Sequence, residues 1–182
     1  MTTSEDACDV AHGHDTLPPI TDRHLVVAFA SPLGSYLLHW GRELGFATTL
    51  VEPDAAVVTR SHRAGTDKVV HDPANAEVAA HTDVIVSDHH RPDLAEVMEP
   101  LVRARPRFIG IIGTPRHEGP HVAALTDAGV DAALIATVQR PIGLDIGSRR
   151  PPEIALSILA GLVADRNGRS GEFFTRGADT NA

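Results

Sequence analysis

The pentapeptide HEGPH, at positions 117–121, matches the zinc-protease pattern His-Glu-x-x-His. In such a site two histidines one helical turn apart hold the metal and the glutamate acts as general base, so all five residues must share one helix. Pro120 removes a backbone donor and pushes Gly119 out of the helical region. The sequence therefore predicts a loop with two surface histidines and a helix that begins at Pro120. A zinc hydrolase ranks last among the functions considered.

Other groups suited to acid–base work or ligand binding come directly after apolar runs of the chain. Adjacent polar residues of this kind also collect in ordinary surface loops, so a functional site and a plain loop remain equal alternatives. Arginine and histidine near a helix N-terminus are suited to an anionic group. The candidate residues are Ala30, Ser31, Gly34, Glu52, Asp88, His89, His90, Gly113, Thr114, Arg116 and His117.

The elements that must position these groups alternate along the chain. Apolar runs predict strands at 24–30, 47–53, 67–70, 83–87, 107–113 and 131–137. Helical spacing predicts helices at 33–46, 91–102, 120–128 and 151–166, with Pro100 expected to end or kink the second of them. This alternation predicts an α/β domain, a three-layer, doubly wound, mostly parallel sheet of the Rossmann-like type.

Composition limits the classes of partner. At 182 residues the chain is long enough for one domain, which we expect at 23–166 between loose tails at 1–22 and 167–182. A net charge of -8 argues against nucleic acid as a partner. No apolar run is long enough to cross a membrane, and the acidic start is unlike a signal peptide. A single cysteine, Cys8, forms no intramolecular disulfide, so we expect a cytoplasmic protein.

The turn after the first strand resembles a nucleotide-binding turn only in part. A dinucleotide site needs Gly-x-Gly-x-x-Gly there, but Phe29 and Ser31 replace the first two glycines and only Gly34 remains. Pro32 also removes an amide donor that a phosphate would use. The acid expected about twenty residues later is present as Glu52. An altered NAD(P) site and a strand-to-helix turn that binds nothing both remain open.

The segment PIGLDIGSRRPPEIALSILA, at 141–160, is the most informative of the chain. Together with IGIIG at 109–113 it resembles the C-terminal Rossmann-like domain of XdhC/CoxI-type proteins, accessory factors for molybdenum hydroxylases. The resemblance covers roughly residues 24 to 170. The sequence departs from the family pattern at 29–32, 87–88, 114–117 and Gly161, and HEGPH lies where the family has a basic turn.

The resemblance implies an accessory protein, not a classical enzyme, that handles the molybdenum cofactor and delivers it to an apo-hydroxylase. It adds Gly143, Asp145 and Gly147 to the expected walls of the binding site. The family's separate N-terminal domain has no counterpart in 1–22, so we expect another protein to supply it, and we expect a homo-oligomer, a dimer most simply. A scaffold that binds no cofactor ranks second, and an NAD(P)-dependent oxidoreductase third.

Overall fold

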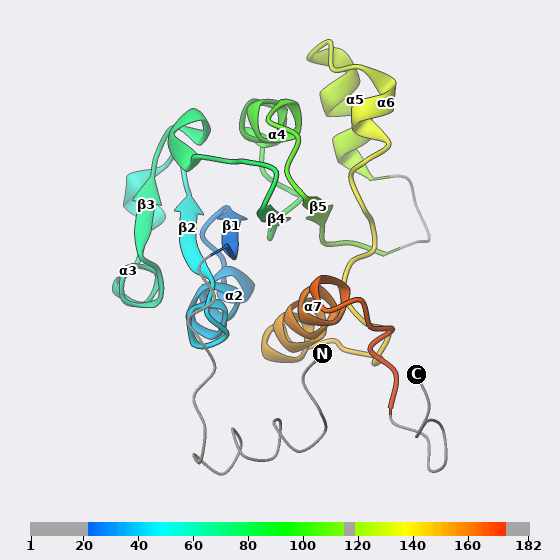
Figure 1. Cartoon of the computed structure of the whole chain (residues 1–182). Helices are drawn as coiled ribbons and strands as arrows, with labels where there is room; N and C mark the ends of the chain where they lie inside the picture. The colour runs from blue at the N-terminus through cyan, green and yellow to red at the C-terminus, as the bar shows by residue number, and fades with distance from the viewer. Residues whose placement is uncertain (1–21, 115–118, 174–182) are drawn as a thin grey trace.

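A five-stranded sheet forms the centre of the computed structural model, which describes residues 22–114 and 119–173 (Figure 1). All its neighbouring strands are parallel, in the order β3-β2-β1-β4-β5. The chain winds outward from β1 to β3, then crosses back to β4 and β5. The strands are β1 (His24–Ala28), β2 (Ala47–Val51), β3 (Lys68–Val70), β4 (Thr82–Val86) and β5 (Phe108–Ile111).

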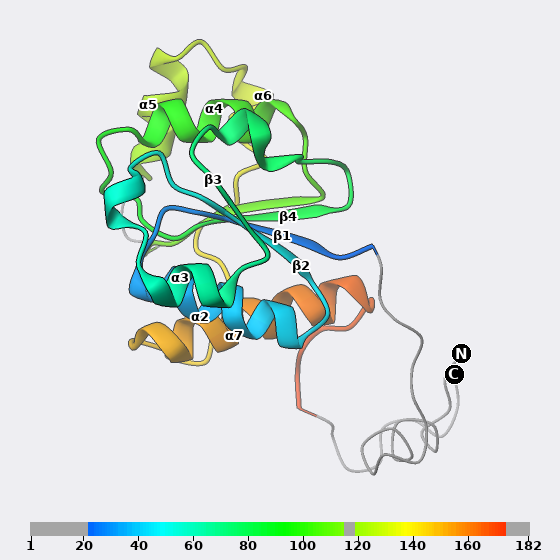
Figure 2. The ribbon, with the colours of Figure 1, turned by 90° about the vertical axis from the view of Figure 1, so that its left-hand side faces the viewer.

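Helices cover both faces of the sheet, as Figure 2 shows. One face carries α2 (Pro32–Glu43), α3 (Arg60–Gly65) and α7 (Pro151–Arg166). The opposite face carries α4 (Leu94–Arg103), α5 (Pro120–Asp127) and α6 (Ala132–Ile135). Short 3-10 turns, η1 (Ala55–Val57) and η2 (Pro73–Ala76), complete the connections. The predicted α/β, doubly wound, Rossmann-like fold is confirmed, and no helix of the described residues is long and apolar enough to traverse a bilayer.

The central position of β1 in the sheet explains why its last four residues, 25–28, are all apolar. Leu25 and Val27 face the cluster formed with α2 and α7, whereas Val26 and Ala28 face the cluster formed with α4. All four side chains are fully buried. A parallel strand covered on both faces shows no polar alternation, because neither side meets water.

The predicted strand at 131–137 is wrong, because α6 occupies this segment. Asp131 starts the helix: its Oδ1 accepts a hydrogen bond from the Ala133 amide at 2.7 Å. A short apolar run alone does not distinguish a buried strand from a buried helix. Just after this segment, Gln139 forms an isolated bridge to β5. Its N–H donates to the Ile109 carbonyl at 2.9 Å, and its carbonyl accepts from the Ile111 N–H at 3.0 Å.

Pro100 and Pro120 occupy different positions in their helices. Pro100 does not end α4, which continues to Arg103 and buries Val97 and Leu101 against the sheet. The free energy gained from this packing outweighs the cost of the backbone hydrogen bond that the proline cannot donate. Pro120 begins α5 as predicted, because Gly119 before it is extended at φ -76°, ψ 139°.

Candidate functional site

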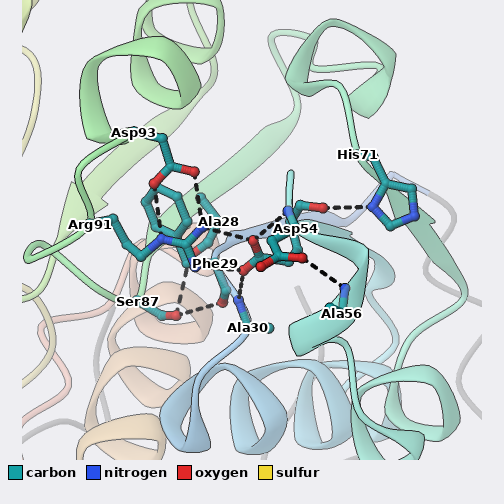
Figure 3. Close-up of polar contacts among 10 residues, drawn as sticks. Ala28, Phe29, Ala30, Asp54, Ala56, His71, Ser87, Arg91 and Asp93 are labelled. Atoms are coloured by element: carbon teal, nitrogen blue, oxygen red, sulfur yellow. Dashed lines mark hydrogen bonds and ion pairs between the residues drawn. The ribbon is translucent and has the colours of Figure 1, made fainter.

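The candidate site lies where the carboxyl ends of β1, β2 and β4 meet. The chain reverses its direction of winding between β1 and β4, and such a switch point opens a crevice in doubly wound sheets. Phe29 to Ser31 follow β1, Glu52 follows β2, and Ser87 to Arg91 follow β4. Figure 3 shows the polar contacts among these segments.

Phe29 occupies the position of the first glycine of a phosphate turn and keeps the backbone that a glycine would have. Its φ is 74°, in the left-handed region, although it carries a bulky side chain. Its N–H donates to the Val51 carbonyl at 2.8 Å, and its ring is fully buried. A left-handed conformation costs an L-residue roughly 1–2 kcal/mol. The turn therefore keeps the left-handed backbone of a glycine, while the aromatic ring packs into the apolar core.

Glu52 is a fully buried carboxylate whose oxygens each accept two hydrogen bonds. Oε2 accepts from the Ala30 amide at 2.8 Å and from Arg91 Nη1 at 3.2 Å. Oε1 accepts from the Asp54 amide at 3.0 Å and from Arg91 Nη2 at 2.9 Å. A carboxylate offers about four acceptor positions, so these four donors satisfy it. No acceptor remains for a ribose hydroxyl while Arg91 stays in place.

Arg91 is held from three sides. It donates to Glu52, and its Nε and Nη2 also donate to the two oxygens of Asp93, each at 2.9 Å. Its guanidinium carbon lies 4.7 Å from the centre of the Phe29 ring, a cation–π distance. Hydrogen bonding to the Arg91 guanidinium lowers the pKa of Asp93 from its ordinary value, and the carboxylates raise the pKa of Arg91. Sequence reasoning missed this arginine.

Serine hydroxyls connect the ends of β1 and β4 across the switch point. Ser31 Oγ lies 2.8 Å from Ser87 Oγ, and Ser87 Oγ also donates to the Phe29 carbonyl at 3.0 Å. Ser31 caps α2, because its Oγ accepts from the Gly34 amide at 2.9 Å. A Cβ on Gly34 would stand 3.1 Å from the Phe29 carbonyl oxygen. The predicted site residues Ser31 and Gly34 are thus used to build the turn.

His62 positions the same turn from α3 and was not foreseen from the sequence. The Thr59 amide donates to His62 Nδ1 at 3.2 Å, so the ring proton resides on Nε2. Nε2 in turn donates to the Ser31 carbonyl at 3.2 Å. The imidazole is 6% exposed, so this contact is shielded from water.

Asp88, His89 and His90 follow β4. The His90 amide donates to Asp88 Oδ1 at 2.9 Å, which fixes a tight turn. The two imidazole rings lie 4.0 Å apart. Partial burial lowers the pKa of His89 from its ordinary value, and the positive charge of Arg140 lowers it further. His89 is therefore biased towards its neutral form.

Arg140 lies beside the end of β5, although its sequence position suggests only a later charged loop. A Cβ on Gly113 would stand 2.6 Å from the guanidinium carbon, so the group rests on the glycine backbone. A Cβ on Gly119 would collide with His121 Nδ1 and would stand 2.9 Å from Arg140 Cδ, so both side chains lie beside this glycine. Arg140, His89 and His121 thus gather at one end of the sheet, with Thr114 following β5. The predicted Arg116 and His117 lie outside the described residues.

The loop 141–147 is seated on α7. Gly143 has φ 89°, and a Cβ there would stand 2.6 Å from Ser157 Oγ. The Leu144 amide donates to the Ser157 carbonyl at 3.1 Å. Asp145 and Gly147 are exposed. Packing against α7 explains the glycine at position 143, whereas Gly147 is explained by its positive φ of 68°. The role of the loop as a wall of a ligand site stays a prediction.

The zinc-protease pattern is not helical as a whole, because Gly119 is extended. His121 is only 4% exposed, so the expectation of two surface histidines is wrong for this residue. Its ring packs against the close backbone of Gly119, which has no side chain to exclude it. Within residues 22–114 and 119–173, no group of three His, Cys, Asp or Glu side chains is placed to hold a metal.

Comparison with known proteins identifies the family. Residues 25–162 match the XdhC Rossmann domain family. The uncharacterized protein YqeB of Escherichia coli K12 is 29% identical over 76 residues, which cover 42% of this chain and 14% of YqeB. A crystal structure of a xanthine dehydrogenase from Bacillus halodurans shares the fold, with a TM-score of 0.65 and 21% identity over 87% of this chain and 45% of that one. This chain thus corresponds to less than half the length of either protein. Since the family match spans most of its residues, the protein belongs to the XdhC Rossmann domain family.

Proposed function

We propose that this domain is an accessory factor for a molybdenum hydroxylase, and that it binds the molybdenum cofactor rather than catalysing a reaction itself. Membership of the XdhC family supports the assignment. The observation that carries it is the cationic group at the end of the sheet, where the Arg140 guanidinium rests on Gly113. A guanidinium is suited to two parallel hydrogen bonds to the phosphate of a pterin cofactor.

The residues around this group fit an anionic, partly aromatic ligand. The N-terminus of α5 lies beside Arg140 and adds a favourable dipole for negative charge. His89, biased towards its neutral form, offers a hydrogen bond without a second positive charge. When bound, the cofactor supplies redox chemistry to its hydroxylase, and the residues of this chain bind and shield it. The proposed walls also include Ala30, Ser31, Gly34, Asp88, His90, Thr114, Arg116, His117, Gly143, Asp145 and Gly147.

Anaerobic titration of the purified protein with molybdenum cofactor tests the proposal. We expect saturable binding by the wild type and at least about tenfold weaker binding by Arg140→Ala, since a hydrogen bond to a charged group contributes about 1.5–3 kcal/mol. Arg149→Ala, which removes an exposed arginine from a later loop, is the matched control and should bind normally. Absence of binding by the wild type, alongside binding by a full-length relative, would exclude the proposed function.

A scaffold that binds a hydroxylase without cofactor is the second candidate. The turn after β1 supports this candidate. Its residues Ala30, Ser31 and Gly34 use their polar groups in hydrogen bonds within the protein. Co-purification with cofactor-free hydroxylase distinguishes the two. A scaffold would bind the hydroxylase equally well with and without cofactor present, whereas a delivery factor should carry the cofactor with it.

The partners of the proposed function are an apo-hydroxylase and, where the family's N-terminal domain is required, a separate protein that supplies it. We also propose a homo-oligomer, which light scattering on the purified protein would detect. An NAD(P)-dependent oxidoreductase is third, since it requires Glu52 to bind ribose while Arg91 occupies its oxygens. A thermal shift with NAD(H) or NADP(H) would favour it, because saturating ligand stabilises the folded state by about 2.7 kcal/mol at a hundred times its Kd.

A further inference from the structure

The pair formed by Glu52 and Arg91 stands where a Rossmann fold binds the ribose of a nucleotide. Glu52 follows β2 and lies beside the turn after β1, which is the location of the acid that accepts hydrogen bonds from ribose hydroxyls. Arg91 presents two N–H groups to this carboxylate, one to each oxygen, at 3.2 and 2.9 Å. The two hydroxyls of a ribose diol would donate to the same carboxylate. The two N–H groups of the guanidinium therefore take the acceptor positions that these hydroxyls would use.

The contacts of Arg91 with Asp93 show that its position is built into the fold. Asp93 stands at the N-cap of α4, where an aspartate usually accepts a hydrogen bond from the helix backbone. Here its side chain makes no cap hydrogen bond and instead receives both Nε and Nη2 of Arg91. The side chain of Arg91 is 20% exposed and that of Glu52 is 0% exposed, so the pair is shielded on the Glu52 side.

Phe29 packs beneath Arg91 at the position where a Rossmann fold binds ribose. It keeps the left-handed φ of 74° that a glycine adopts freely, so the backbone path of a nucleotide-binding turn is preserved. Its buried ring lies under the Arg91 guanidinium, at 4.7 Å from the guanidinium carbon. The ring and the guanidinium together fill the space beside Glu52.

We propose that Arg91 is a specificity-determining residue, which fills the ribose position of this Rossmann fold and thereby excludes ribonucleotides. The inference concerns a subsite different from the Arg140 group and goes beyond the proposed function. Removal of Arg91 should leave a carboxylate with two free acceptor positions beside a turn whose backbone still has the nucleotide-binding shape. A purely structural ion pair makes a different prediction, since its removal would destabilise the protein without creating affinity for ribose.

The test measures binding of AMP and NADH by calorimetry to the wild type, to Arg91→Ala and to the double variant Phe29→Gly/Arg91→Ala. We expect Arg91→Ala to bind AMP at least about tenfold more tightly than the wild type, because hydrogen bonds to a charged group are regained. The double variant should bind more tightly again, since its turn has regained a glycine. The probe 2′,3′-dideoxyadenosine monophosphate, which lacks both hydroxyls, should show none of the gain.

Folding is checked by circular dichroism and cooperative thermal unfolding. Arg91→Gln is the second variant and decides the test if Arg91→Ala does not fold, because glutamine can still donate one hydrogen bond to Glu52. Folded variants that gain no affinity for AMP would overturn the proposal. So would wild-type protein that binds AMP as tightly as the variants, or a gain that the dideoxy probe shows equally.

The two proposals fail separately. Binding of molybdenum cofactor by the wild type depends on the residues near Arg140 and does not require that Arg91→Ala gain affinity for AMP. In the same way, a gain of AMP binding by the variants would stand even if the wild type bound no cofactor.

Discussion

Arg166, the last residue of α7, donates from Nε to Oδ2 of the fully buried Asp83 at 2.9 Å. Arg107 donates from Nε to the other oxygen of Asp83 at 2.7 Å. The three residues lie at the amino-terminal end of the sheet, opposite the candidate site. They join β4 to the end of α7, so the final helix is anchored to the sheet by charge as well as by its apolar face.

We expect Asp83→Ala to lower the free energy of unfolding by about 3–5 kcal/mol, because it leaves two partly buried guanidinium groups without their carboxylate. Denaturant unfolding measures the change. The matched control is Glu99→Ala, which removes the acid of an exposed pair with Arg103 at 3.0 Å. Its cost should be no more than about 0.5 kcal/mol, as for other exposed helix pairs. Equal costs for the two variants would contradict the anchoring role.

At Phe29 we expect the glycine variant to be more stable than the alanine variant, the reverse of the usual order of stability. Both Phe29→Ala and Phe29→Gly remove the buried ring and should destabilise the protein by about 3–5 kcal/mol. Because φ is 74° at this position, alanine keeps the backbone strain whereas glycine relieves it. We expect the glycine variant to be the more stable by about 1 kcal/mol. A higher melting temperature for the alanine variant would show that the residue does not hold a left-handed conformation.

Gly143 and Gly147 form a natural pair for testing how the loop is seated. Both have positive φ, 89° and 68°, so alanine introduces backbone strain at either position. Only at Gly143 would the new Cβ also meet α7, at 2.6 Å from Ser157 Oγ and 3.1 Å from the Ile158 amide nitrogen, whereas nothing lies within 4 Å at Gly147. We expect Gly147→Ala to cost about 1 kcal/mol. Gly143→Ala should cost a further 1–3 kcal/mol or so from overpacking. Equal melting temperatures would mean that the loop does not press on the helix.

Glu52 was predicted as a site residue from its spacing after the first strand, and it stands directly after β2. Its partner was not predictable, because Arg91 lies 39 residues further along the chain and belongs to no motif. The signal available was the position of Arg91 among the acids and histidines that follow β4. Whether the Glu52 carboxylate is free to bind a ligand depends on its tertiary contact with Arg91.

The strands and helices themselves were largely predictable, since apolar runs and helix starts are local properties. Pro151 begins α7 and Pro120 begins α5, as the sequence predicted. The segment 131–137 was predicted as a strand because its apolar residues fit either structure, and the capping by Asp131 decided for a helix. The closeness of Arg140 to Gly113 depends on how a later segment returns to the sheet, which no local pattern records.

The pKa of His89 provides a further prediction. Burial first, and then the charges of His90 and Arg140, lower it below the ordinary value of 6.5. The folded protein therefore binds fewer protons at this ring than the unfolded chain, and its stability should fall as the pH falls from 6.5 through the folded pKa. NMR titration of the imidazole should give a midpoint below 6.5 in the wild type and a higher one in Arg140→Gln.

The control for this titration is Arg60→Gln, which removes one positive charge from an exposed position of α3. It should leave the midpoint of His89 unchanged, because charges separated by solvent are screened. A midpoint that shifts equally in both variants would reflect net charge alone and would contradict the closeness of Arg140 to His89.

The single bridge of Gln139 to β5 has a consequence for affinity. Both backbone groups of Gln139 are bound to the edge strand, at 2.9 and 3.0 Å, and Arg140 is the next residue. The backbone directly before Arg140 is therefore held by the edge strand, and a ligand bound by Arg140 would have to order little more than one side chain. Immobilising a rotamer-rich side chain costs about 0.5–1.5 kcal/mol, whereas ordering a mobile loop would add a cost for every residue fixed. The bridge of Gln139 to β5 thus fixes the position from which the next residue, Arg140, extends its positive charge.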